Sequence, residues 1–578
     1  MADLSRRHLI KTAALVAGAG AGAGVSTSTL AQSAPAFSAG SEGQSQGRHF
    51  ARITADGSDV RALSLQQGFN RRWFAGNCEV IYLCYDTEGV ATALEEVIQR
   101  YGRRFSIKSG GHCYENFVFN PKIKAIIDTS ALNQMLHTDH GYTLGAGCSN
   151  WDTHVWLLRE GLCLPAGSCY SVGLGGHICG GGFGLLSRLH GLTVDWLSAV
   201  TLVVLEKNGT PVIKTVSKNS ADADERDLFW AHTGGGGGNF GVITAYHFET
   251  LPKAPEAALI GNLAWQWADV DAARLGALLD VFAELSNDAP REFFGLFNLN
   301  HISAGGQFNL VYQIVSSEDI PVERLNAASR SIERQMTDIA APVASVTPII
   351  GQMCWLGQAP AKSKNIHTYY EALQQLNGSG PNQRSKYKSA YMKKAFPFDQ
   401  VEKIHHWLTT QPDDIAPNDT AQTLVQVDSY GGAVNDVAGT DTAIAHRESI
   451  MKLQYQSYWV QNRSEPGDKD DRTGRALVRW LNDSYADIYS EYGGVPDPSN
   501  DSTGTVDGCY YNYPDIELSR PPRSIHDAME LYFKQNFKPD SKQSLDDSFA
   551  PKERHLMTIK NRWDPGRYFV HGQSIPFE

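Results

Sequence analysis

The stretch PAGSCYSVGLGGHICGGGFG, residues 165–184, concentrates glycine around two cysteines and one histidine. Glycine is roughly 0.5–1 kcal/mol less favourable than alanine inside regular structure. So dense a run of glycine indicates that the backbone must turn sharply or approach another group closely. Three interpretations are open at this point: a metal site, a backbone cradle for phosphate, and ordinary turns.

Length and composition narrow the class of protein. The chain has 578 residues, of which 42% are hydrophobic and 20% are charged, and this predicts a globular protein with two or more domains. Its formal net charge of -12 argues against nucleic acid or an anionic membrane as the main partner. The alternative interpretation of the negative charge is that it only keeps the protein surface soluble.

The N-terminus carries an export motif. Residues 5–11, SRRHLIK, place Arg6 and Arg7 before a mildly apolar stretch that is too short and too weak to span a membrane. This order resembles the bacterial twin-arginine signal. We therefore expect residues 1–44 to be a signal peptide and disordered linker, cleaved near Ala31, and the mature protein to be periplasmic or secreted. An arbitrary basic start before a disordered tail is the alternative.

Strand and helix signals change character along the chain. EVIYLCY (79–85) predicts a strand and GVATALEEVIQRYG (89–102) predicts a helix. Beyond residue 255, segments such as FGLFNLNHIS (294–303) alternate like antiparallel strands between helical stretches. These patterns predict an α/β or α+β first domain over 45–254, a second domain with an antiparallel sheet flanked by helices over 255–505, and a C-terminal segment over 506–578. For the chain as a whole we expect the α+β class.

Metal binding is the weakest interpretation of the glycine-rich stretch. Cys169 and Cys179 lie ten positions apart and lack the CxxC spacing of structural zinc sites. His112 and Cys113 are adjacent, so they are not well placed to share an ion. No metal is therefore expected.

A phosphate cradle fits better, because backbone N–H groups approach a pyrophosphate only where side chains are absent. Glycine clusters recur at 110–111, 175–184 and 234–241. Three clusters favour an extended dinucleotide. None of them matches G-x-G-x-x-G in a strand–turn–helix setting, so a Rossmann site is not expected.

The order of these motifs resembles the FAD domain (PCMH type) of the vanillyl-alcohol oxidase superfamily, and more narrowly its berberine-bridge-enzyme-like branch. The similarity covers about residue 60 to the end. It implies a two-subdomain FAD-binding domain over 45–254, a substrate domain, and a C-terminal segment that returns to the FAD domain. The segments that carry it are SIKSGGHCYENF (106–117), GSCYSVGLGGHICGGGFG (167–184), DLFWAHTGGGGGNFGVIT (227–244), DSYGGAVNDV (428–437), GCYYNYPDIEL (508–518) and NRWDPGRYFVHGQSI (561–575).

The resemblance implies FAD that is bonded twice, through the histidine of S-G-G-H and the cysteine of G-x-C, here His112 and Cys169. Imidazole and thiolate are both nucleophiles able to add to an electrophilic flavin. In isolation, each would be interpreted as a core or capping side chain. Cys179 is expected to be a small buried residue. The resemblance places these further residues at the cofactor: Ser109, Gly110, Gly111, Val172, Gly175, Gly176, Gly180, Gly181, Gly182, Asn239, Gly241, Val242, Asn512 and Tyr513.

Alcohol oxidation needs a general base, and a tyrosine can serve if its neighbours lower its pKa from about 10. In CYYNYPD the strand period of two places Tyr510 and Asn512 on one face. The family's Y-x-N pattern falls on the same two residues, so the resemblance implies Tyr510 as the base. Tyr430, in DSYGG, is a second catalytic candidate. The alternative is that these tyrosines only pack a strand.

The resemblance thus implies an exported FAD-dependent oxidoreductase whose small-molecule substrate carries an oxidisable hydroxyl, on a carbohydrate or a hydroxylated secondary metabolite. Val172 stands where the branch gates oxygen, which favours O2 as acceptor and H2O2 as product. Two alternatives stay open: a dehydrogenase that uses another acceptor, and a flavin-retaining binding protein without turnover. Arg567 departs from the asparagine in the family's D-P-x-N-x-F, which puts the narrow subfamily in doubt.

Overall fold

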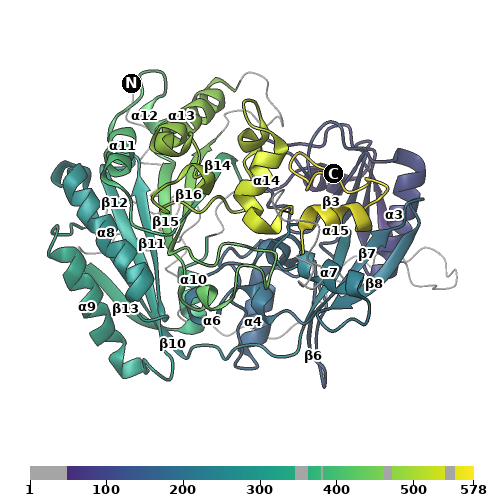
Figure 1. The fold of residues 1–578 in the computed structure, drawn as a ribbon, viewed down its shortest axis with the longest axis horizontal. Coiled ribbons are helices and arrows are strands. Elements are labelled where there is room, and N and C mark those ends of the chain that lie inside the picture. Colours follow the sequence, from purple (N-terminus) through teal and green to yellow (C-terminus); the bar gives the residue numbers. More distant parts are fainter. Residues whose placement is uncertain (1–48, 345–361, 379–381, 461–470, 540–553) are drawn as a thin grey trace, which may run out of the picture. The chain divides into compact units, whose positions relative to one another are not determined.

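The computed structural model describes residues 49–344, 362–378, 382–460, 471–539 and 554–578 (Figure 1). The twin-arginine motif and the rest of the predicted signal lie outside the described residues. Three sheets with helices around them make up the described part, which confirms the predicted α+β class. The domain boundaries given above stay predictions.

Two sheets come from the N-terminal part of the described chain. Their strands are β1 (Phe50–Thr54), β2 (Val80–Cys84), β3 (Phe105–Lys108), β4 (Ala125–Asp128), β5 (Met135–Thr138), β6 (Gly141–Gly145), β7 (Ala199–Leu205), β8 (Pro211–Ser217) and β9 (Val242–Phe248). The four-stranded sheet has the order β1-β2-β4-β3, with β2 and β3 both parallel to β4. The five-stranded sheet has the order β5-β6-β9-β7-β8 with antiparallel neighbours.

The β2–α3 unit shows how local sequence determines these elements. Helix α3 (Thr87–Tyr101) begins where the Asp86 carboxylate accepts a hydrogen bond from the Gly89 N–H at 2.7 Å. It ends at Gly102, whose φ of 62° favours glycine. Its apolar residues at helical spacing are buried against the sheet. The strand predicted at 79–85 and the helix predicted at 89–102 are therefore confirmed.

The third sheet has seven strands in the order β13-β10-β12-β11-β15-β16-β14, all with antiparallel neighbours. The strands are β10 (Ala257–Gln266), β11 (Phe293–Asn300), β12 (Gln307–Val315), β13 (Lys362–Thr368), β14 (Arg384–Met392), β15 (Thr423–Ser429) and β16 (Met451–Trp459). Helices α8 (Ala272–Asp288), α9 (Leu325–Thr337), α11 (Phe398–Thr409) and α13 (Arg472–Ile488) are grouped around it in Figure 1. This confirms the predicted antiparallel sheet flanked by helices.

Shorter helices connect the sheets and carry the glycine-rich segments. They are α2 (Val60–Leu65), α4 (Asn150–Leu158), α5 (Leu174–His177), α6 (Ser187–His190), α7 (Ala223–Ala231), α10 (Tyr369–Gln375), α12 (Pro417–Thr420), α14 (Ile525–Phe533) and α15 (Leu556–Trp563). Helix α5 lies inside the stretch 165–184, and α6 follows that stretch directly.

Arg188, on α6, fastens the glycine-rich segment to the seven-stranded sheet. Its side chain is 1% exposed and donates hydrogen bonds to four backbone carbonyls. The acceptors are those of Phe293 at 2.8 Å, Tyr430 at 2.6 Å, Ala289 at 3.1 Å, and Ser286. Burial lowers the pKa of the guanidinium to about 10, so it stays charged at neutral pH. The negative end of α8, near two of these carbonyls, favours the cation.

We expect Arg188→Lys to lower the free energy of unfolding by about 3 kcal/mol, because one ammonium cannot reach carbonyls that a planar guanidinium serves together. Urea denaturation measures the change. Arg291→Lys is the matched control: its ion pair with Asp436 is about half exposed, so we expect little change there. Equal losses in the two variants would contradict the role assigned to Arg188.

Candidate active site

A cavity of about 320 Å3 opens where the glycine-rich segments meet the seven-stranded sheet and the C-terminal segment. Twelve of the predicted site residues line it: Ser109, Gly110, Gly111, His112, Cys169, Val172, Gly175, Gly176, Gly241, Tyr510, Asn512 and Tyr513. Six do not: Gly180, Gly181, Gly182, Asn239, Val242 and Tyr430. The fold thus brings residues from distant parts of the chain into a single cavity.

His112 lies in this cavity as a neutral imidazole. Its Nε2 is 2.9 Å from the Ser171 hydroxyl, and its ring stacks on Phe69 with centroids 4.9 Å apart. Burial lowers the pKa of His112 to about 4. A neutral ring at pH 7 retains a nitrogen lone pair that is able to act as a nucleophile.

Cys169 lines the same cavity as a free thiol. Burial raises its pKa to about 12, and the nearby positive charge of Lys452 acts in the opposite direction. Since the thiolate is the nucleophile, a base or a stronger local positive field is needed to activate this sulfur.

Backbone contacts between glycines bring the His112 and Cys169 segments together. A Cβ on Gly110 would lie 2.3 Å from the Gly173 nitrogen, closer than any side chain tolerates. A Cβ on Gly173 would lie 2.4 Å from the Ser109 hydroxyl oxygen. By contrast, a Cβ on Gly176 would have no atom within 4 Å, so this glycine faces open space in the cavity.

The glycines that do not line the cavity make room for neighbouring side chains or adopt a backbone conformation that favours glycine. A Cβ on Gly180 would lie 2.1 Å from the Asn512 side-chain oxygen, so this glycine makes room for Asn512. Gly182 has a φ of 73°, which favours glycine. Asn239 hydrogen-bonds the Tyr511 hydroxyl at 3.1 Å, and Val242 is a fully buried residue of β9. In this structure these residues shape the walls without lining the cavity.

Asn512 holds Tyr510 within a turn, in which the Tyr513 N–H donates to the Tyr510 carbonyl at 3.0 Å, so the strand predicted for this motif is wrong. The Asn512 amide donates to the His177 carbonyl at 2.9 Å and to the Tyr510 hydroxyl at 3.2 Å. Burial raises the pKa of Tyr510 above its ordinary value, and the opposing effects of Lys452 and the Asn512 hydrogen bond do not bring it below that value in this structure. The Lys452 ammonium lies 5.6 Å from the centroid of the Tyr510 ring.

Sequence reasoning missed three polar residues of this site. Lys452 is fully buried and donates to the Asp428 carboxylate at 2.7 Å and to the Tyr513 hydroxyl at 3.1 Å. Gln426 donates to Asp428 at 2.6 Å, and these two residues line the cavity. The available signal was polar residues at every second position in TLVQVDS and MKLQYQSYW, a pattern unusual for buried strands.

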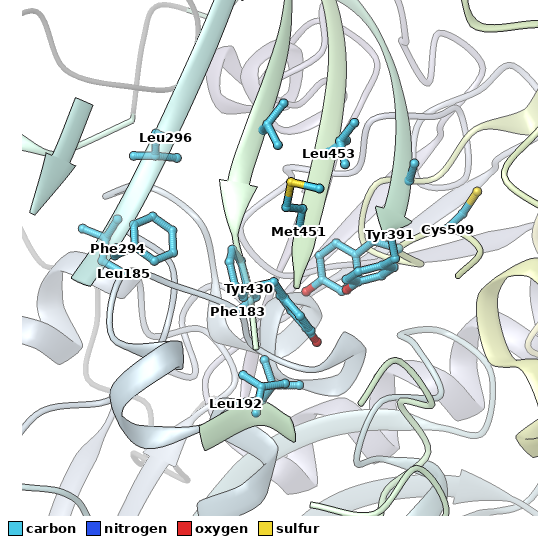
Figure 2. Close-up of a cluster of buried hydrophobic side chains, with 14 of the residues drawn as sticks. Phe183, Leu185, Leu192, Phe294, Leu296, Tyr391, Tyr430, Met451, Leu453 and Cys509 are labelled. Carbon is cyan, nitrogen blue, oxygen red and sulfur yellow. The ribbon is translucent and has the colours of Figure 1, made fainter. Parts of the chain in front are cut away.

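Tyr430 lies beside the cavity without lining it. Its ring centroid is 5.3 Å from that of Phe183, which does line the cavity, and Figure 2 shows the two rings side by side. Its hydroxyl donates to the His446 carbonyl at 3.1 Å. Of the two predicted catalytic tyrosines, Tyr510 lines the cavity and Tyr430 does not.

Other predicted properties concern cysteines, metals and membranes. The eight cysteines within the described residues are free. Over the same residues, no group of three or more His, Cys, Asp or Glu side chains is placed to hold a metal ion. None of the described helices has the length and apolar character to cross a membrane.

Comparison with known proteins assigns the chain to a family. A family model described as FAD binding domain matches residues 79–213. Hexose oxidase from Chondrus crispus is 39% identical over 544 residues, which cover 90% of this chain and 94% of the relative. The chain belongs to the berberine-bridge-enzyme-like family of FAD-linked oxidoreductases.

Further relatives of this FAD-linked oxidoreductase agree. Aclacinomycin-N/aclacinomycin-A oxidase from Streptomyces galilaeus is 30% identical, with 99% of this chain and 98% of the relative covered. Among solved structures, a glycopeptide hexose oxidase complexed with teicoplanin superimposes with a TM-score of 0.75 at 29% identity, over 91% of this chain and 99% of that one. The resemblance seen in the motifs is therefore confirmed.

The cavity of the oxidoreductase fits FAD. The glycines that line it are Gly110, Gly111, Gly173, Gly175, Gly176, Gly237 and Gly238, and the open space at Gly176 is a cradle that a Cβ would fill. Backbone N–H groups exposed in this way suit a pyrophosphate. The Oδ1 atom of Asn150, also in the lining, is buried without a hydrogen-bond partner among the described residues.

Arg567 replaces the family asparagine outside the cavity. Its φ is 55°, in the left-handed region that asparagine and glycine adopt more readily than arginine. The side chain is exposed, with its guanidinium 4.6 Å from the centroid of the Phe577 ring. The next residues, Tyr568 to His571, line the cavity. Arg567 therefore contributes to the cavity through the turn of its backbone and not through its side chain.

We expect Gly176→Ala to lower the FAD content of the purified oxidoreductase while its thermal stability without FAD stays unchanged or rises. The new methyl enters the cofactor cradle, whereas helical backbone such as that of α5 favours alanine over glycine. Flavin absorbance relative to protein measures occupancy. As a control, Gly175→Ala places its Cβ 2.9 Å from the Ala146 carbonyl oxygen and should destabilise the fold itself. Full FAD content in Gly176→Ala would contradict the cradle.

Proposed function

We propose that this oxidoreductase oxidises a hydroxyl group of a carbohydrate or a hydroxylated metabolite, with a hexose unit as the favoured substrate. The observation that carries the proposal is one cavity that holds Tyr510 together with the polar pair Gln426 and Asp428. Buried amide and carboxylate groups suit recognition of several sugar hydroxyls at once. The similarity to a hexose oxidase at 39% identity and to aclacinomycin oxidase at 30% supports the same substrate classes.

In this proposal, His112 and Cys169 both hold FAD covalently. The support is that they line one cavity, that His112 is neutral there, and that their segments touch through Gly110 and Gly173. Two attachments fix the ring without enclosing it, which leaves the cavity open to a bulky substrate.

Tyr510 is the general base of the proposed reaction. It acts as the phenolate, whose oxygen takes the proton of the substrate hydroxyl, and the Asn512 hydrogen bond and the Lys452 charge stabilise the negative charge that this oxygen carries before the transfer. Gln426 and Asp428 orient the substrate by hydrogen bonds. When bound, FAD would supply a hydride acceptor for the carbon that bears this hydroxyl, which would leave the substrate as a carbonyl compound, and we expect O2 to receive the electrons and form H2O2.

We expect Tyr510→Phe to lower kcat by about 10²- to 10⁴-fold, the usual contribution of a general base, with KM changed only a few-fold. A peroxidase-coupled assay with hexoses as substrates measures the rate. Tyr430→Phe is the matched control, since it removes an equally buried hydroxyl that faces a carbonyl outside the cavity, and its kcat should stay near wild type. A larger loss in Tyr430→Phe than in Tyr510→Phe would reverse the two roles.

Turnover with an artificial acceptor but without peroxide would indicate the dehydrogenase alternative.

The covalent attachment has its own test. We expect acid precipitation to leave the flavin on the protein, and peptide mass spectrometry to find it on the peptides that contain His112 and Cys169. His112→Ala and Cys169→Ala should each retain flavin through the other residue. Release of the yellow colour into the supernatant by acid would disprove both attachments.

We also propose export through the twin-arginine pathway. Its support is the motif with Arg6 and Arg7 in the N-terminal sequence.

A further inference from the structure

A cluster of four buried charges lies outside the cavity lining. We call Glu115, Lys386, Lys388 and Asp515 the Asp515 cluster. Their side chains are between 1% and 5% exposed. Lys386 pairs with Glu115 at 2.5 Å and with Asp515 at 2.6 Å, and Lys388 pairs with Asp515 at 2.6 Å. Two ammonium groups thus face two carboxylates, and the cluster is neutral as a whole.

Stability does not explain such a cluster. Removing each ion from water costs several kcal/mol, and apolar side chains of similar volume usually give an equally stable or more stable core. What the charges supply is a fixed geometry, because each short ion pair holds the two segments that it joins in one relative position.

The segments joined in this way are those that carry the proposed chemistry. Glu115 follows His112 by three residues, and Asp515 follows Tyr510 by five. The two lysines lie on β14, which is the edge strand of the seven-stranded sheet. One strand therefore holds both the histidine loop and the tyrosine segment.

Contacts around the cluster strengthen the attachment of the histidine loop. Between His112 and Glu115, the Tyr114 ring stacks on Tyr387 of β14, with centroids 3.6 Å apart and planes 8° apart. Glu115 then pairs with Lys386, the residue before Tyr387. Successive side chains of the loop thus dock on successive residues of the strand.

Asp515 is fixed from two further directions. Its backbone N–H donates to the Tyr532 hydroxyl of α14 at 3.1 Å. Its carbonyl accepts from the Gln573 amide at 2.7 Å. Although burial alone raises the pKa of the Asp515 carboxyl, the two ammonium groups hold it below its usual range, so the group stays ionised.

We propose that the Asp515 cluster is a positioning centre that sets the separation between His112, the proposed flavin tether, and Tyr510, the proposed base. None of its four residues lines the cavity, so they act through the segments that they hold. The roles of His112 and Tyr510 rest on the proposed function. A displacement of about 1 Å between reacting groups can reduce a rate on the order of a hundredfold, which makes such a centre consequential.

The test compares Glu115→Gln and Asp515→Asn with wild type. Both keep the side-chain shape and remove one charge. We expect kcat to fall about tenfold in Glu115→Gln and further in Asp515→Asn, with KM within twofold. We also expect a smaller fraction of flavin linked at His112, measured by peptide mass spectrometry without substrate. If Asp515→Asn does not fold, Glu115→Gln by itself still tests the proposal.

Two further variants separate positioning from stability. Lys388→Met combined with Asp515→Asn restores neutrality, so we expect thermal stability to recover while kcat and the His112-linked fraction stay low. Arg384→Met is the matched control on the same strand. It breaks a buried ion pair with Asp471 at 2.7 Å, which ties β14 to α13 and not to the cavity segments. It should lower the melting temperature and leave kcat within twofold of wild type.

The inference is overturned if Glu115→Gln and Asp515→Asn keep wild-type kcat and attachment, or if Arg384→Met loses as much of both as they do. Wild-type protein that carries linked flavin but oxidises no hydroxyl substrate would instead contradict the proposed function. In that case the His112-linked fraction still decides the inference.

Discussion

The site depends on the contact between two glycine backbones, Gly110 and Gly173. Each lies where the other leaves no room for a Cβ, so no side chain is possible at either position. This contact places the loop with His112 against the loop with Cys169, and leaves Gly176 facing open space. The glycine content of residues 165–184 is therefore a requirement of geometry: a cofactor cradle with two nucleophiles needs backbone without side chains at its base.

A second constraint on the cavity is the burial of polar groups beside it. Lys452, Asp428 and Gln426 are between 0% and 4% exposed, and each is hydrogen-bonded to another member of the set. In a medium of low polarity an unpaired polar group is costly, so the set forms one arrangement. In the proposed reaction, such a network favours a substrate hydroxyl that completes its hydrogen bonds over one that cannot. In this proposal, substrate specificity follows from the requirement that buried polar groups have hydrogen-bond partners, which also applies to the folded sheet.

The sequence predicted what local patterns determine. The strand at 79–85, the helix at 89–102 and the antiparallel sheet depend on short-range periodicity, and the family motifs placed twelve residues in the cavity lining. It did not predict the partners of Asp515, because Lys386 lies 129 residues away and only the folded strand order brings them together. Lys452 was missed for a related reason, since a lysine within an alternating strand normally faces solvent. Tyr430 was chosen on a short motif and lies behind Phe183, a matter of side-chain packing that no motif specifies.

The role proposed for Tyr510 depends on an apolar wall as well as on its polar neighbours. Phe183, Phe294 and Leu296 line the cavity next to the polar set, and Figure 2 shows them within one hydrophobic cluster. The Lys452 ammonium lies 4.4 Å from the centroid of the Phe183 ring. Because Lys452 and Tyr510 are both buried, the field of that ammonium at Tyr510 is screened less than it would be in solvent. The apolar wall raises the pKa of the tyrosine by burial, and it also strengthens the effect of the Lys452 charge, which lowers that pKa. Binding of a substrate displaces water from the cavity and therefore increases both effects.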